Sequence, residues 1–144
     1  MHEQLKAYFE ASDVQFRVGQ KTKDGLKGSA LAYIQTHAIM DRLDAVVGSM
    51  NWRVQYLVIN SPDGWGVLCT LSIRDPETGD WVEKSDVGVP GNYEVLKGAH
   101  SDSFKRAACQ WGIGRYLRLI KPQWYPIDQW GQFTQPPVIP ATHC

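Results

Sequence analysis

The sequence lacks a long apolar run: none approaches the roughly 20 consecutive apolar residues that a membrane-spanning helix needs. Its first six residues, Met1-His-Glu-Gln-Leu-Lys6, are polar and have no apolar stretch of the kind that a signal peptide requires. We therefore expect a protein that stays in the cytoplasm and has no membrane partner.

Cysteine is scarce, with three residues at wide spacing, Cys69, Cys109 and Cys144. A disulfide framework normally uses an even number of cysteines, and a zinc site uses closely spaced pairs. The four histidines also lack metal-ligand spacing such as His-Glu-x-x-His. The sequence therefore predicts reduced thiols, no metal and no other cofactor.

The sequence also lacks the motifs of common active sites. There is no glycine-bounded nucleophilic serine, and Gly112-Ile-Gly114 is too short to form a phosphate loop. A metal cluster could be formed by the acids Asp75, Glu77, Asp80, Glu83 and Asp86, but most of them belong to a turn. Pro62-Asp63 followed by Glu83-Lys84-Ser85 resembles a nuclease pattern, but that pattern requires a lysine where this chain has Ser85. We expect a protein that is not an enzyme, and a small metal-dependent nuclease is the remote alternative.

What the sequence does have is an uneven charge distribution. The 15 basic and 15 acidic residues cancel over the whole chain. Residues 92–124 nevertheless hold six cations against two acids, and residues 29–91 hold four cations against eight acids. Such a protein can bind a polyanion at one place and repel it elsewhere, which favours a binding groove or rim over a generally basic surface.

The first third of the chain predicts helices around one extended segment. Apolar spacing indicates a short helix over residues 3–11, an extended segment over 14–18 and a mobile, glycine-rich loop over 19–28. Ser29 is a suitable N-cap for a long helix that ends at Val47, before Gly48.

At 144 residues we expect a single binding domain over residues 1–130, and a disordered tail over residues 131–144, where prolines are frequent.

The middle of the chain has the alternation of β-strands. Three strands are predicted over residues 52–59, 65–73 and 81–88, joined by turns at 61–64 and 75–80, with the third strand at an edge. A helix should follow from Asn92 or Tyr93 to Trp111 and be ended by two glycines. One stripe of mainly small residues should lie close against the sheet: Leu96, Ala99, Ser103, Ala107 and Trp111. The predicted fold class is α+β, a three-stranded antiparallel β-meander with packed helices.

Basic side chains of this helix form the candidate site. Lys105 and Arg106 are adjacent, so they diverge by about 100° on a helix and at least one of them points outward. With Lys97 two turns earlier, they can bind successive phosphates of a nucleic-acid backbone. A solvated helix face is the plain alternative. Further candidates for DNA binding are Arg115 after the helix, and Lys21 and Lys23 in the glycine-rich loop.

Other side chains near these cations could contribute. Aromatic rings can stack on the bases of single strands, and the candidates for this are Tyr33, Tyr93, Trp111 and Tyr116. Asp102 is expected to pair with Lys105 at i, i+3 or with a neighbouring subunit.

Three motifs carry a resemblance to a known family: Asp41-Arg-Leu-Asp-Ala-Val46, Ser101-Asp-x-x-Lys-Arg106 and Gln110-x-Gly-Ile-Gly-Arg-Tyr116. With them, residues 14–125 resemble the Rad52-type single-strand annealing proteins, and most closely their bacterial DNA-damage-response members. The resemblance implies a β-β-β-α core that assembles into closed rings, with single-stranded DNA in a positively charged groove around the outside.

The resemblance also assigns residues. It implies that Lys105 and Arg106 line the inner part of that groove and that Arg17 contributes from before the first long helix. Eukaryotic members have a further arginine where this chain has Cys109, and Arg115 could compensate for it. A recombinase-binding tail is not expected.

The resulting prediction is a homo-oligomeric, ring-forming protein that binds single-stranded DNA and promotes annealing of complementary strands in recombination and DNA repair. It would act in the cytoplasm of a bacterial or phage-infected cell, without a cofactor. The alternative within the same fold is a scaffold that protects DNA ends and does not anneal them.

Overall fold

A computed structural model describes residues 1–91 and 94–139. It divides into two compact units, which we describe separately: unit 1 comprises residues 1–7 and 36–113, and unit 2 comprises residues 8–35 and the chain from 114 onward. Within the described part of the chain, no helix is both long and apolar enough to cross a membrane. The assignment of residues 1–130 to one binding domain and 131–144 to a tail stays a prediction, and residues 140–144 lie outside the described part.

Unit 1 contains the predicted meander. Strands β3 (Trp52–Ser61), β4 (Gly64–Arg74) and β5 (Trp81–Gly88) form an antiparallel sheet in that order. The central strand β4 buries every second side chain, namely Val67, Cys69, Leu71 and Ile73. The meander, its turns and the edge position of β5 confirm the sequence prediction.

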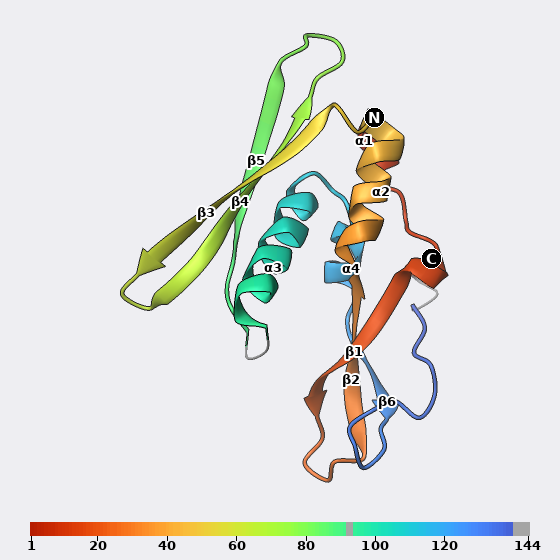
Figure 1. Cartoon of the computed structure of the whole chain (residues 1–144). Helices are drawn as coiled ribbons and strands as arrows, with labels where there is room; N and C mark the ends of the chain where they lie inside the picture. The colour runs from red at the N-terminus through yellow and green to blue at the C-terminus, as the bar shows by residue number, and fades with distance from the viewer. Residues whose placement is uncertain (92–93, 140–144) are drawn as a thin grey trace. The chain divides into compact units, whose positions relative to one another are not determined.

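Helix α3 (Val95–Gln110) lies along one face of this sheet and contacts β4 and β5 (Figure 1). Its small buried residues allow a close approach: a Cβ on Gly88 would lie 2.3 Å from the backbone nitrogen of Ser103. Of the predicted stripe, Leu96 does not fit, because it is 61% exposed. The described helix begins at Val95, and the predicted starting residues, 92 and 93, lie outside the described part.

Two short helices complete unit 1, α1 (His2–Lys6) and α2 (Thr36–Val47). The Arg42 guanidinium joins them, because Nη1 donates to three backbone carbonyl oxygens at the end of α1, at 2.8 to 3.3 Å. Two residues further along α2, the Asp44 carboxylate accepts from the Trp52 indole at 2.7 Å. Between them Leu43 is fully buried. The motif 41–46 therefore has a structural role in this unit.

Unit 2 contains a sheet that the sequence analysis missed. Strands β1 (Val14–Lys21), β2 (Lys27–Ile34) and β6 (Gln123–Pro126) form an antiparallel sheet with β2 in the centre. The predicted helix over 29–47 is therefore wrong for residues 29–34, and the predicted loop over 19–28 is the tip of a β1–β2 hairpin. Asp24-Gly25 makes its turn, with Gly25 at φ +74°, and this dipeptide was the overlooked hairpin signal.

Two further predictions concern the ends of helices. The first helix ends at Lys6 and not near Ala11, and a short 3-10 helix, η1 (Ala11–Asp13), precedes β1. Helix α3 ends before Gly112 and Gly114, which have φ values of +90° and +71°. The glycine pair thus ends the helix as predicted, and α4 (Arg115–Leu119) follows.

Candidate functional site

Three of the predicted DNA-binding cations lie on α3 of unit 1. Lys97 is exposed, and Lys105 and Arg106 are half-buried. At 3.6 residues per turn, Lys105 lies about 12 Å along the axis from Lys97, and Arg106 lies roughly on the opposite side of the helix from Lys97. The three charges therefore follow a path around α3 and do not form one straight row.

Arg106 is held by an acid of the same helix. Its Nε donates to Asp102 Oδ2 at 3.1 Å, and the Arg106 side chain remains 42% exposed. The same carboxylate oxygen accepts from the backbone N–H of Val89 at 3.2 Å. The partner of Asp102 on α3 is Arg106 at i, i+4, whereas the sequence analysis expected Lys105 at i, i+3. The alternative pairing of Asp102 with a neighbouring subunit stays a prediction. Asp102 thus joins the end of β5 to the basic helix.

The remaining predicted cations belong to unit 2. Arg17 and Lys21 lie on β1, Lys23 lies in the turn of the hairpin, and Arg115 is the first residue of α4. All four are exposed. The structure therefore groups the seven predicted residues in two sets, one on each unit, and their role in DNA binding stays a prediction.

The four aromatic candidates have different surroundings. Trp111 is 6% exposed, and its indole N–H donates to the Leu71 carbonyl oxygen at 3.0 Å. It is a core residue, so the suggestion that it stacks on bases is wrong. In unit 2, Tyr116 stacks on Tyr8 at 4.1 Å between ring centres, and Tyr33 hydroxyl donates to a glutamine of β1. Tyr93 lies outside the described residues.

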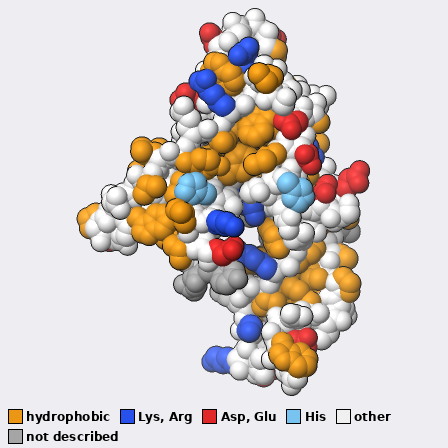
Figure 2. Space-filling model, viewed as in Figure 1, with side chains coloured by type: hydrophobic (Ala, Val, Ile, Leu, Met, Phe, Trp, Pro, Cys, Tyr) orange, Lys and Arg blue, Asp and Glu red, His pale blue; other side chains and the backbone are white. Residues whose placement is uncertain are grey.

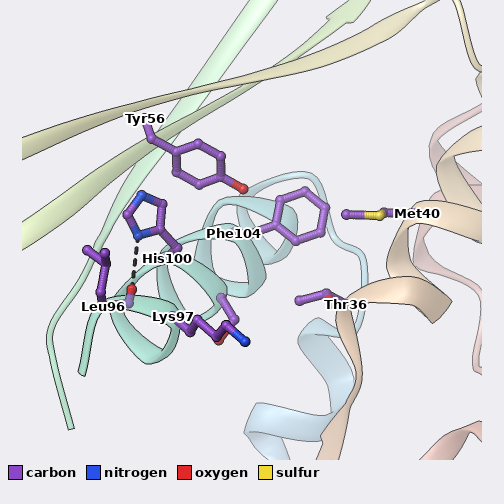
Figure 3. Close-up of a pocket in the computed structure, with 8 residues that line it drawn as sticks. Thr36, Met40, Tyr56, Leu96, Lys97, His100 and Phe104 are labelled. Atoms are coloured by element: carbon purple, nitrogen blue, oxygen red, sulfur yellow. Dashed lines mark hydrogen bonds between the residues drawn. The ribbon is translucent and has the colours of Figure 1, made fainter. Parts of the chain in front are cut away.

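A pocket of about 380 Å³ opens beside Lys97, entirely within unit 1 (Figure 3). It is bounded by α2, β3 and α3, and its principal lining residues are Thr36, Met40, Tyr56, Lys97, His100 and Phe104. The Tyr56 and His100 rings lie 4.9 Å apart between centres, tilted by 52°. The sequence analysis did not identify this pocket, because Tyr56 and His100 come together only when α3 packs on the sheet.

The polar groups of the pocket include a histidine and a phenol. The His100 Nδ1 lies 3.0 Å from the Leu96 carbonyl oxygen and donates to it, so Nε2 faces away from this bond. Burial, with a smaller contribution from the neighbouring Cys69 thiol, raises the pKa of Tyr56 to about 12. Burial also raises the pKa of Cys69 to about 11. Near neutral pH the pocket therefore presents a phenol and no anionic side chain.

The sequence analysis also did not identify a pair of arginines on the Trp81 ring. On the sheet face opposite α3, Arg53 and Arg74 place their guanidinium carbons 4.3 and 4.9 Å from the centre of the Trp81 ring. Neither guanidinium has an ion pair or hydrogen bond to a described residue. Arg74 is paired directly with Trp81 across β4 and β5, and this could have been inferred from the length of the connecting turn.

Comparisons with known proteins agree with the family resemblance that the three motifs carry. A family of sequences described as Rad52/22 family double-strand break repair protein matches residues 1–124. The single-stranded DNA-binding protein DdrA of Deinococcus deserti is 34% identical over 143 residues, which cover 97% of this chain and 66% of that protein. DdrA of Deinococcus radiodurans is 31% identical over 131 residues, which cover 89% of this chain and 59% of that protein.

The chain thus spans about three fifths to two thirds of the length of these relatives. Both relatives are named for DNA binding and not for a reaction. No solved structure matches the chain. The match extends over both units, from α1 through the meander and α3 to the start of β6, and it confirms the resemblance inferred from the motifs. The chain belongs to the Rad52/22 family of double-strand break repair proteins.

Proposed function

We propose that this protein binds single-stranded DNA and promotes the annealing of complementary strands in recombination and repair. The observation that carries the proposal is the set of three cations on α3, Lys97, Lys105 and Arg106, in a chain whose relatives are named single-stranded DNA-binding proteins. Cations at successive positions along a helix can bind successive phosphates of one strand. Arg17, Lys21, Lys23 and Arg115 of unit 2 would add further phosphate contacts.

Annealing follows from how such a site would hold a strand. When phosphates are bound by arginine and lysine, most bases remain available for pairing, and hairpins within the strand are opened. Neutralised phosphates also repel a second strand less. The free energy of base pairing then drives the reaction, so no nucleotide hydrolysis is required. Since both relatives are bacterial, we place this activity in the cytoplasm of a bacterial or phage-infected cell.

We also propose that the protein forms a homo-oligomeric ring. Among the described residues of unit 1, the outer edges of β3 and β5 pair with no further strand, and such edges can pair with another chain. Apolar side chains also lie open on the surface (Figure 2), and in unit 1 they include Met40, Leu57, Val58 and Leu96, which are 39 to 61% exposed. A sedimentation mass near the 16.3 kDa of one chain at micromolar concentration would refute the assembly.

The central experiment removes two α3 cations. The double variant Lys105→Ala with Arg106→Ala should bind a single-stranded oligonucleotide more weakly, because two phosphate contacts are lost. The slope of log affinity against log salt concentration should become shallower by about 1 to 2. Fluorescence anisotropy over a salt series measures both quantities.

The matched control is Arg53→Ala with Arg74→Ala, which removes the same charge from the sheet face that α3 does not cover. This control should change the salt slope less than the α3 variant does. Equal changes in the two variants would mean that binding depends on net charge and not on α3.

A second candidate function is protection of DNA ends without annealing. It is favoured by the names of the relatives, which state single-stranded DNA binding and no annealing. Two complementary oligonucleotides, one with a fluorophore and one with a quencher, separate the two functions. Faster quenching with the protein supports annealing. Unchanged quenching, together with resistance of the bound strand to an exonuclease, supports protection.

A further inference from the structure

The pocket beside Lys97 has the properties of a site for a flat, apolar ring attached to an anion. Its volume of about 380 Å³ is in the range of small-molecule sites. Phe104, which is 1% exposed, is its buried aromatic residue, and Tyr56 is 40% exposed beside it. Figure 3 shows Tyr56 between His100 and Phe104, with Lys97 below them on α3.

The charge at the rim argues for an anionic group on the occupant. Lys97 is exposed, and it makes no ion pair or hydrogen bond to any residue in the described part of the chain. No aspartate or glutamate lines the pocket. An ammonium group next to an apolar pocket fits a ligand whose ring enters the pocket while its phosphate stays in solvent.

The polar atoms of the pocket fit a heterocycle better than an alkyl side chain. Because His100 Nδ1 is bonded to the Leu96 carbonyl oxygen, Nε2 is the ring nitrogen that can bond to a heterocycle, as an acceptor when the ring is neutral and as a donor when it is protonated. The Tyr56 phenol is a donor, and Thr36 and Ser101 bring hydroxyl groups to the lining. Aromatic faces beside a few polar groups stack on any nucleobase with little preference for sequence.

From this combination we infer that the pocket binds one nucleobase of the single-stranded DNA, stacked on Tyr56 with His100 at the edge of the base and the adjoining phosphate on Lys97. The inference rests on the proposed function and deepens it. Of the bases along a bound strand, the one at Lys97 is withdrawn from pairing, and its neighbours stay available. The site thereby fixes the position of the strand on unit 1 by a base, in addition to its backbone.

The experiment compares a thymidine oligonucleotide with an abasic sugar-phosphate chain of the same length. The wild-type protein should bind the thymidine oligonucleotide more tightly. Tyr56→Leu, which keeps apolar volume and removes the aromatic face, should weaken binding of that oligonucleotide at least about fivefold and leave binding of the abasic chain unchanged. Lys97→Ala should weaken both and lower the salt slope by about 1.

The matched control is Met50→Ala, which removes an 83% exposed apolar side chain two residues before β3. This variant should bind both ligands like the wild type. A 2-aminopurine base in the oligonucleotide gives an independent signal: its fluorescence should be quenched on the wild type and less on Tyr56→Leu. Thermal unfolding of each variant shows whether it is folded.

The outcomes separate the inference from the function on which it rests. If the wild type binds neither ligand, the proposed function fails. If it binds both equally, and Tyr56→Leu changes neither affinity nor quenching, the function stands and the base site is refuted. If Tyr56→Leu lowers the oligomeric mass and has no base-dependent effect, the pocket holds a side chain of a second copy, which also overturns the inference.

Discussion

Asp102 holds Arg106 through a contact of 3.1 Å between Oδ2 and Nε, one turn apart on α3. The pair places an anion within the basic set of this helix and occupies one donor of the guanidinium. Because the Arg106 side chain is 42% exposed, its other donors can still reach a ligand. Asp102 should therefore moderate the affinity of α3 for a polyanion.

Replacing this acid should strengthen DNA binding. In Asp102→Asn, the amide oxygen can still accept from the backbone N–H of Val89, whereas the negative charge near Arg106 is gone. We expect single-strand affinity to rise a few-fold at low salt, with a steeper salt slope, because repulsion of the phosphates is removed. Stability should change by less than about 1 kcal/mol, as is typical of exposed ion pairs on a helix. Anisotropy titrations and urea unfolding measure the two effects.

Glu77→Gln is the control for this change, since it removes one negative charge in the turn between β4 and β5. Its effect on affinity should be smaller than that of Asp102→Asn. If both variants gain affinity equally, the influence of Asp102 is through net charge and not through Arg106.

The close approach of α3 to β5 gives a second prediction. In Gly88→Ala the new Cβ would lie 2.3 Å from the Ser103 nitrogen and 2.6 Å from the Ala99 carbonyl oxygen, so the helix or the strand must shift. We expect a loss of about 1 to 3 kcal/mol in the free energy of unfolding, the usual range for overpacking. Gly91→Ala is the control, because no atom of the described residues, its chain neighbours apart, lies within 4 Å of the added Cβ. Equal melting temperatures for the two variants would contradict the close packing.

The bonds from Arg42 to the end of α1 give a third prediction. Arg42→Ala would leave the carbonyl oxygens of Gln4, Leu5 and Ala7 without its guanidinium, which now lies 2.8 to 3.3 Å from them. Losing these charge-assisted bonds should lower stability by about 2 kcal/mol. The exposed Arg53, whose guanidinium bonds to no carbonyl oxygen of the described residues, is the comparison: Arg53→Ala should cost less than about 1 kcal/mol. Chemical denaturation measures the free energy of unfolding of both variants. A smaller loss for Arg42→Ala than for Arg53→Ala would contradict the structural role of Arg42.

A fourth prediction concerns alkaline pH. In the unfolded chain the Cys69 thiol and the Tyr56 phenol have ordinary pKa values of 9.0 and 10.0, whereas in the folded protein the pKa values rise to about 11 and about 12. The unfolded state then binds fewer protons, so this contribution to stability is complete below pH 9 and is lost as the pH rises to about 12. Urea unfolding at several pH values should show this decline.

Two variants assign that decline to its groups. Tyr56→Phe should flatten the upper part of the pH profile, and Cys69→Ala should flatten the lower part, because each removes one of the two groups that titrate. A profile that is as steep in both variants as in the wild type would show that other groups cause the loss of stability.

Much of unit 1 could be predicted from the sequence, because its signals are local. Alternating side chains from Trp52 to Gly88 specify strands, the short turns specify antiparallel neighbours, and Gly112 and Gly114 end α3. The positions of Lys97, Lys105 and Arg106 on one helix followed directly. The prediction of a helix over residues 29–34 was wrong. The apolar spacing there is compatible with a helix, but β2 pairs with β1 and β6 and forms a strand.

The sequence by itself determined the β-meander, the basic helix after it and the motifs that mark the family, since each depends on neighbours along the chain. Only the tertiary structure decided that Asp102 pairs with Arg106, that Trp111 is a core residue, and that Tyr56 and His100 enclose a pocket beside Lys97. These features depend on contacts between residues far apart in the sequence, and which side chains meet is fixed by how closely α3 packs on the sheet. That distance is set by the absence of a side chain at Gly88 and by the small residues facing it, which periodicity alone does not reveal.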